Sequence, residues 1–229
     1  MGQSPRMTIK LLLRDAELFK GVSEQALARL EAAGRLRRLA RGQVLFNRGD
    51  AGEAFFLVCS GSINLGLDSA NGRELVINEM RPGDGFGELG LITGQPRSTS
   101  AVAAQDTVVL VIPRRDFMAV LADEPALARS LLRTTADRLG TSSEREGALA
   151  FLNAPSRLAR VLIQLDREAS AVGYITMSQE ELGRRVGLAR QTVAQLLGKW
   201  RHSGWILTGR GKIVVLNHAA LRRQAEEEG

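Results

Sequence analysis

The sequence predicts an α+β chain with an N-terminal antiparallel β jelly roll and flanking helices, a long dimerisation helix, and a C-terminal winged helix-turn-helix. Three observations predict this fold. Short apolar runs separated by turn residues occupy about residues 42–111, a spacing typical of antiparallel sandwiches and jelly rolls. A helical period then continues over residues 126–152. The last third holds a helix, a glycine turn, a second helix and a hairpin.

The composition is that of an ordinary globular protein. Its 229 residues suffice for one large domain or two small ones, and 44% of them are apolar. No run of about 18 apolar residues occurs, so we expect no membrane span and no membrane partner. The apolar run at residues 9–13 is interrupted by Lys10 and followed by charges, which argues against a secretory signal. We therefore expect a cytoplasmic protein.

Cysteine and histidine are scarce. The single cysteine, Cys59, lies in an apolar run and is interpreted as a buried strand thiol. One thiol makes no intrachain disulfide and holds no iron–sulfur cluster. Both histidines, His202 and His218, lie near the C-terminus. We therefore expect no metal, haem or iron–sulfur cluster as a cofactor.

Positive charge is concentrated in the C-terminal third. From Phe151 onward there are 12 Lys and Arg against 7 Asp and Glu, a net charge of +5 out of +6 for the whole chain. A compact basic domain favours a polyanionic partner. A solvated basic face is the alternative.

The first elements can be placed in order. A helix is expected over residues 23–33, because Ala26, Leu27 and Leu30 fall at helical spacing. Turn signals then separate short strands, and Asn71-Gly72 between two apolar runs indicates a tight hairpin. The expected strands are residues 43–46, 54–59, 62–67, 74–78, 100–103 and 107–112.

A long helix is expected after Pro125, over residues 126–152. Leu132, Ala136 and Leu139 fall at helical spacing, whereas residues 140–146 are polar all round. Two interpretations remain open. The helix pairs with a second copy as a two-fold coiled coil, or it is an ordinary packed helix with a solvated centre.

Asn153-Ala154-Pro155 is expected to end the long helix, and a further helix is expected over residues 157–166. This break is the predicted domain boundary. The expected domains are a jelly roll over residues 1–122, the long helix over 123–152, and the winged helix-turn-helix over 153–229.

The stretch FGELGLITGQPRSTSA, residues 86–101, carries the strongest chemical signal. Residues 85–90, which overlap its start, match G-x-G-x-x-G, but Gly94-Gln95-Pro96 ends any helix after about one turn, and strand-like residues follow. A dinucleotide fold needs a long helix there, so that interpretation is rejected.

A cyclic nucleotide explains the charged residues of this stretch. A phosphate favours backbone N–H groups at a helix start together with a guanidinium, which Gly87 and its successors and Arg97 provide. Glu88 then accepts the ribose 2′-OH, and Glu88 and Arg97 partly neutralise each other when the site is empty. The candidate ligand residues here are Gly87, Glu88, Leu89, Arg97, Ser98 and Thr99.

The basic third has the pattern of a DNA-binding module. Ser178 and Glu181 form a capping box at the start of one helix, and Gly187 makes the turn to a second helix over residues 190–201. Arg pairs with guanine and Gln with adenine, whereas Thr and Lys commonly bind phosphates. A helical packing domain with surface glutamines is the alternative. The candidate DNA-binding residues are Ser178, Gln179, Arg190, Gln191, Thr192, Gln195 and Lys199, with Arg210 and Lys212 in the hairpin.

The stretch at residues 86–101 resembles the phosphate-binding cassette of cyclic-nucleotide-binding domains, which carries Phe-Gly-Glu-Leu, a short turn and then Pro-Arg. Together with the helix-turn-helix, residues 10–220 resemble the cyclic-AMP receptor protein family of bacterial transcription regulators. The segment 148–152 matches the family's hinge. The resemblance also implies that Ser142 and Ser143 on the long helix bond the adenine base.

The resemblance implies a homodimer that binds cyclic AMP, or cyclic GMP, as an allosteric effector. It implies double-stranded DNA with a roughly palindromic operator and RNA polymerase as partners. We expect no enzymatic activity, because no nucleophile–base pair or metal cluster can be assembled from the sequence. We also expect Arg97→Ala to abolish the response to nucleotide while leaving the fold intact.

The recognition helix departs from the family pattern at three positions. Members often begin the recognition helix with Ser-Arg-Glu and place an Arg one turn later, whereas this chain has Ala189-Arg190-Gln191 and Gln195. A different operator is therefore expected. A nucleotide-independent DNA-binding protein of the same fold is the alternative.

Overall fold

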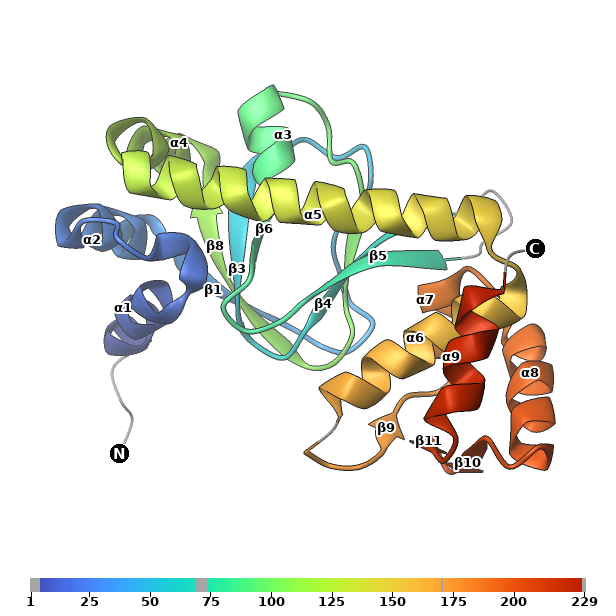
Figure 1. The fold of residues 1–229 in the computed structure, drawn as a ribbon. Coiled ribbons are helices and arrows are strands. Elements are labelled where there is room, and N and C mark those ends of the chain that lie inside the picture. The colour runs from blue at the N-terminus through green and yellow to red at the C-terminus, as the bar shows by residue number, and fades with distance from the viewer. Residues whose placement is uncertain (1–4, 69–73, 170, 228–229) are drawn as a thin grey trace. The chain divides into compact units, whose positions relative to one another are not determined.

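The computed structural model describes residues 5–68, 74–169 and 171–227. The chain forms two compact units, one of Met1–Leu67 with Val76–Leu139 and one of Asp68–Leu75 with Gly140–Gly229. Figure 1 labels their elements along the chain. The predicted α+β class is confirmed, because antiparallel sheets, a long helix and a helix-turn-helix are all present.

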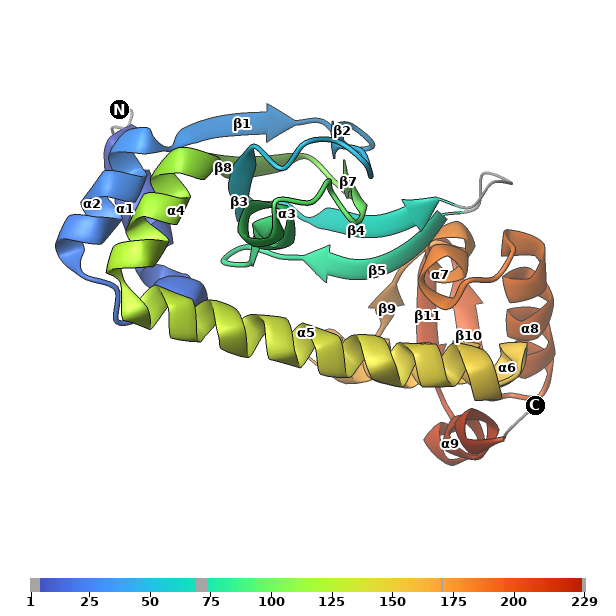
Figure 2. The same ribbon diagram turned by 90° about the horizontal axis from the view of Figure 1, so that it is seen from above.

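The first unit begins with helices and continues with strands. Its helices pack together at one end of the sheets, where α1, α2 and α4 lie near the start of α5 (Figures 1 and 2). In chain order the elements are α1 (Pro5–Asp15), η1 (Glu17–Phe19), α2 (Glu24–Ala33), β1 (Arg35–Leu39), β2 (Val44–Phe46), β3 (Ala54–Ser60), β4 (Ile63–Asp68), β5 (Glu74–Met80), β6 (Gly85–Phe86), α3 (Glu88–Thr93), β7 (Ser100–Ala103), β8 (Thr107–Pro113), α4 (Arg114–Asp123) and α5 (Pro125–Phe151).

The strands form two four-stranded sheets in the described part of this unit. Their orders are β1-β8-β3-β6 and β2-β7-β4-β5, and the pairings whose registers are resolved are antiparallel. Figure 2 shows β4 and β5 side by side in the second of these sheets. Neighbouring strands that are not consecutive in the chain, such as β1 with β8 and β2 with β7, are typical of a jelly roll, as the strand spacing predicts.

Strand β3 contributes side chains to two hydrophobic cores of the first unit. Its side chains alternate, so that Phe56 and Val58 enter the core between the sheets while Phe55 and Leu57 face the core beneath the helices. The Phe55 ring stacks on Phe117 of α4, with ring centroids 4.2 Å apart. A strand buried on both faces reads as a continuous apolar run, as residues 54–59 do.

Cys59 ends this run and is half-buried. Burial raises the pKa of its thiol to about 11. The thiol is therefore protonated near neutral pH. Cys59 lies in a strand as predicted, but it is half-buried rather than buried.

Helix α5 leaves part of its apolar face exposed. Leu132 and Leu139 are 72% and 67% exposed, and they lie seven positions apart on the same side of the helix. In contrast, Leu127 and Leu131 are buried in the core of the first unit. Large exposed aliphatic side chains at heptad spacing favour the coiled-coil interpretation over that of an ordinary packed helix.

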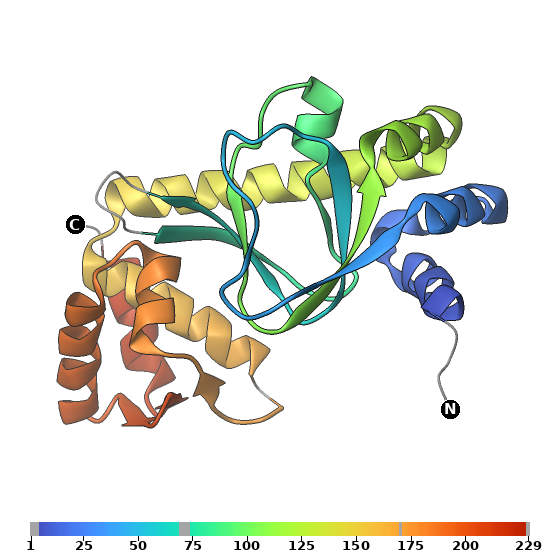
Figure 3. The same ribbon diagram turned by 180° about the vertical axis from the view of Figure 1, so that it is seen from behind.

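The second unit is a helical domain with a small sheet. Figure 3 shows its helices around that sheet. The core gathers Leu162 of α6, Leu182 of α7 and Trp200 of α8. Its elements are α6 (Ala154–Glu168), β9 (Ile175–Thr176), α7 (Gln179–Val186), α8 (Arg190–His202), β10 (Ile206–Gly209), β11 (Lys212–Val215) and α9 (His218–Glu226), with sheet order β10-β11-β9.

Several predicted boundaries differ from the observed ones. Helix α6 begins at Ala154 rather than residue 157, because Asn153 caps it and Pro155 sits in the first turn, where a missing N–H costs nothing. Strand β1 and helix α1 were not predicted. The hairpin expected at Asn71-Gly72 lies outside the described residues.

Candidate functional site

The predicted phosphate-binding stretch forms a strand, a tight turn and a short helix. Gly87 has a left-handed backbone (φ 87°) and is the N-cap of α3, so the helix begins at Glu88. A Cβ on Gly87 would lie 2.7 Å from the Nη1 atom of Arg97. Glycine is therefore required here by both the backbone conformation and the close guanidinium.

Glu88 is held in place by an arginine of the long helix. Its side chain is buried, and the residue is only 4% exposed. Arg138 Nη1 lies 2.9 Å from Glu88 Oε1, and Arg138 Nη2 donates to the carbonyl of Gly85 at 2.5 Å. A carboxylate fixed in this way at a helix start is an oriented acceptor for a hydroxyl.

Arg138 is the site residue that the sequence interpretation missed. A signal was available, because Arg138 precedes Ser142 by four positions and so lies on the same side of α5. Arg97 lies within the stretch at residues 86–101, whereas Arg138 lies far from it in sequence. Only the packing of α5 brings it to Glu88.

Arg97 is buried, with 5% of the residue exposed. Its Nη1 donates to the Gly87 carbonyl at 2.8 Å and its Nη2 to the Ala54 carbonyl at 2.7 Å. The guanidinium carbon lies 4.4 Å from the ring centroid of Phe46 and 5.3 Å from that of Phe56. Arg97 is therefore part of the packing of the jelly roll as well as a candidate ligand residue.

The charge of Arg97 is only partly compensated. Burial lowers the pKa of its guanidinium, while Glu88, Asp50 and Glu53 act in the opposite direction. Its Nε is buried and has no partner among the described residues. A buried cation with a free donor is suited to binding an anion such as a phosphate. Glu88 pairs directly with Arg138 and influences Arg97 only through its charge.

The remaining ligand candidates are less constrained. Leu89 and Ser98 are exposed, and Thr99 is half-buried. Ser142 and Ser143 lie on the part of α5 that belongs to the second unit, and their predicted contact with the adenine base stays a prediction. Ser142 Oγ donates to Glu146 at 3.4 Å.

The second candidate site is the helix-turn-helix. The predicted capping box is confirmed, because Ser178 Oγ accepts from the Glu181 N–H and the Glu181 carboxylate accepts from the Ser178 N–H. Gly187 makes the turn with φ 70°. Ala189 gives α8 no side-chain cap, which leaves the first N–H groups of α8 without such a partner.

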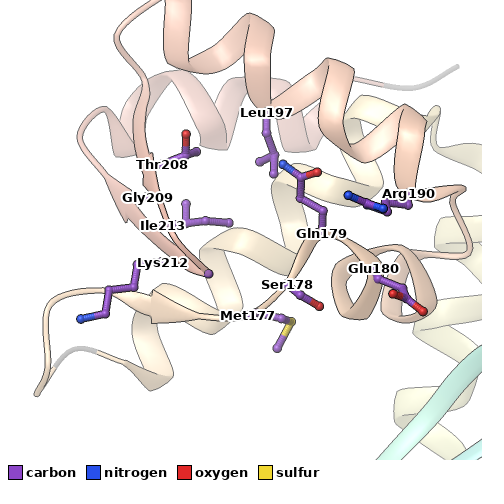
Figure 4. A pocket seen from close by; sticks show the side chains of 11 residues that line it. Met177, Ser178, Gln179, Glu180, Arg190, Leu197, Thr208, Gly209, Lys212 and Ile213 are labelled. Carbon is purple, nitrogen blue, oxygen red and sulfur yellow. The ribbon is translucent and has the colours of Figure 1, made fainter.

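The structure brings four of the predicted DNA residues to one pocket. Figure 4 shows this pocket, of about 520 Å³, between α7, α8 and the β10–β11 hairpin. Ser178 and Gln179 come from the start of α7, Arg190 from the start of α8, and Lys212 from β11. Glu180, which was not predicted, also lines it.

The other DNA candidates do not line this pocket. Gln191, Gln195 and Lys199 are exposed and recur every four residues, so they form one polar side of α8. Thr192 is half-buried beside them, and Arg210 is exposed in the turn of the hairpin. The opposite side of α8 buries Val193, Leu197 and Trp200 in the core of the second unit.

No cluster of three or more His, Cys, Asp or Glu side chains suitable for a metal ion occurs among the described residues. No helix among them is long and apolar enough to cross a membrane.

Family models match both candidate sites. A cyclic nucleotide-binding domain matches residues 36–124, and a Crp-like helix-turn-helix domain matches residues 156–224. The first match contains Glu88 and Arg97, and the second contains all the predicted DNA candidates.

Whole-length relatives agree with the family models. The chain is 30% identical over 220 residues to a "CRP-like cAMP-activated global transcriptional regulator" of Mycobacterium tuberculosis, covering 93% of this chain and 98% of the relative. It is 30% identical over 213 residues to a "Cyclic AMP receptor protein" of Thermus thermophilus, with the same coverage. The c-di-GMP-responsive global regulator CLP of Xanthomonas campestris has a similar fold, with a TM-score of 0.77 and 24% identity over 84% of this chain and 99% of that one.

Proposed function

The chain belongs to the cyclic-AMP receptor protein family of bacterial transcription regulators, and we propose that within this family it is activated by cyclic AMP. The observation that carries the proposal is the buried guanidinium of Arg97, with its unpartnered Nε, near the oriented carboxylate of Glu88. Arg97 supplies the charge for a cyclic phosphate, and Glu88 supplies the acceptor for a ribose 2′-OH. Two relatives at 30% identity bear cyclic AMP in their names, which favours the adenine nucleotide.

Arg138 connects the proposed nucleotide site to helix α5. A ribose hydroxyl that bonds Glu88 shares that carboxylate with Arg138, which belongs to α5. Because α5 continues as one helix to Phe151, a change at Arg138 acts on the helix that ends at the hinge. The ligand shifts the protein to its DNA-binding state only by binding that state more tightly.

The proposed assembly is a homodimer on double-stranded DNA with a roughly palindromic operator. The two copies of α8 then occupy successive major grooves about 34 Å apart. In functional terms we assign nucleotide binding to residues 1–122, dimerisation to 123–152 and DNA binding to 153–229. We further propose that the protein acts in the cytoplasm as a non-catalytic regulator and that it contacts RNA polymerase.

Calorimetric titration of the purified protein tests the choice of nucleotide. We expect a saturable isotherm with cyclic AMP and weaker binding of cyclic GMP and c-di-GMP. If cyclic GMP binds more tightly than cyclic AMP, cyclic GMP is the effector. Absence of binding to all three would favour the alternative of a nucleotide-independent DNA-binding protein.

Arg190→Ala should relax DNA specificity at one base step. Arg190 leads α8 with an exposed side chain, and a bidentate arginine–guanine contact is worth about 1–3 kcal/mol. Binding measured against a set of single-base operator variants should lose its preference at one position. Lys199→Ala on the same helix is the matched comparison, since loss of a phosphate contact weakens binding to every sequence alike. An even loss with Arg190→Ala as well would contradict the base-reading role.

A further inference from the structure

The small sheet of the second unit places an aromatic ring beside a lysine of the hairpin. Strand β11 pairs with β9 so that Lys212 lies opposite Thr176 and Ile213 opposite Ile175. Ile175 and Ile213 are buried in the core. Tyr174 precedes Thr176 by two positions, and alternation along an extended chain puts it on the same side as Thr176. Tyr174 is therefore the diagonal neighbour of Lys212 on the outer side of this ladder.

The contact between the two side chains is a cation–π interaction. Lys212 Nζ lies 4.1 Å from the centroid of the Tyr174 ring. Lys212 is exposed, and the described residues include no carboxylate that forms an ion pair with it. Figure 4 shows the Lys212 side chain extending from the start of β11 away from Arg190. The ring thus orders the ammonium group without neutralising it.

We infer that Tyr174 is a positioning residue for DNA binding, which holds the Lys212 ammonium ready to contact a backbone phosphate. The inference rests on the proposed function, because it assumes that the hairpin approaches DNA. A free lysine side chain loses rotamer freedom when it binds a phosphate, and this loss weakens the complex. Packing on the Tyr174 ring already restricts the Lys212 side chain, so part of this loss of rotamer freedom occurs before DNA binds. Tyr174 is the single tyrosine of the chain, so no other tyrosine replaces it.

The test measures the salt dependence of binding to a duplex of mixed sequence, in the presence of cyclic AMP, for full-length variants. Phosphate contacts are sequence-independent, so no operator is needed. Because a bound dimer carries two copies of Lys212, Lys212→Met should reduce the slope of log K against log salt by about 1.8 and weaken binding about sixtyfold at 0.1 M salt. Tyr174→Leu should weaken binding roughly two- to tenfold and leave the slope unchanged, because the lysine charge remains. Tyr174→Phe keeps the ring and should bind like the wild type.

The double variant Tyr174→Leu/Lys212→Met distinguishes positioning from a structural effect. If Tyr174 acts through Lys212, the double variant binds as Lys212→Met does. Equal losses from Tyr174→Leu with and without Lys212 would overturn the inference, as would wild-type binding by Tyr174→Leu. A wild-type slope in Lys212→Met would refute the phosphate contact of the hairpin. This result would leave the proposed roles of Arg190 and of the nucleotide site unaffected. A wild-type protein that binds no duplex would instead refute the proposed function itself.

Discussion

Replacing Arg97 with glutamine should weaken cyclic nucleotide binding by about ten- to hundredfold, because a buried hydrogen bond to a charged group contributes about 1.5–3 kcal/mol. Glutamine keeps a donor but loses the positive charge that faces the phosphate. Titration calorimetry with cyclic AMP measures the change. DNA binding by this variant should need about ten- to hundredfold more nucleotide for the same response.

The contacts of Arg97 lead us to expect that Arg97→Ala also destabilises the fold, in contrast to the expectation from the sequence. The Arg97 guanidinium satisfies the carbonyls of Ala54 and Gly87 and packs on two aromatic rings. Alanine would leave both acceptors unpaired, at a cost of about 1–3 kcal/mol each if buried. Thermal unfolding must therefore accompany the binding measurement.

A matched control for Arg97→Gln is Arg48→Gln, which removes the same charge from an exposed position of the same unit. This variant should bind cyclic AMP within about twofold of the wild type, because exposed charges contribute little. Wild-type affinity in a folded Arg97→Gln protein would remove Arg97 from the ligand site.

The double variant Leu132→Glu/Leu139→Glu should be monomeric at concentrations where the wild type is a dimer. Each leucine contributes about 1.5–3 kcal/mol when fully buried against a partner helix. Glutamate loses this contribution and places like charges near each other across the two-fold axis. Sedimentation analysis measures the association. Operator affinity should fall by several orders of magnitude, because each half-site is then bound separately.

Arg133→Glu is the control for this variant, because Arg133 is exposed on the same helix beside Leu132. It adds negative charge without removing an apolar contact, so the dimer should persist. A dimer that survives in the double leucine variant would place the interface elsewhere and revive the interpretation of α5 as an ordinary helix with a solvated centre.

The fold was predictable from the sequence where local pattern and burial agree. Residues 54–59 form an uninterrupted apolar run, and the strand is buried on both faces. Strand β1 was missed because its sequence, RLRRL, resembles no half-buried strand. Four of its five residues are exposed, so backbone pairing with β8 rather than an apolar face makes it a strand.

The candidate site was predictable only in part. Glu88 and Arg97 lie in one short stretch, and their spacing indicated a ligand that offers both a phosphate and a hydroxyl. The partners of these residues come from elsewhere. Arg138 and the Ala54 carbonyl are far from the stretch in sequence, and only tertiary packing brings them to it. The same packing makes Arg97 a structural residue as well as a candidate ligand residue, which the sequence pattern alone does not indicate.

The most direct test of the account is the affinity for DNA with and without cyclic AMP. Duplexes enriched from a random library in the presence of cyclic AMP supply the operator, and fluorescence anisotropy supplies the affinity. The account predicts binding at least about tenfold tighter with cyclic AMP for the wild type, a coupling of about 1.4 kcal/mol, and a smaller difference for Arg97→Gln at the same cyclic AMP concentration. Equal affinity of the wild type in both conditions would contradict it.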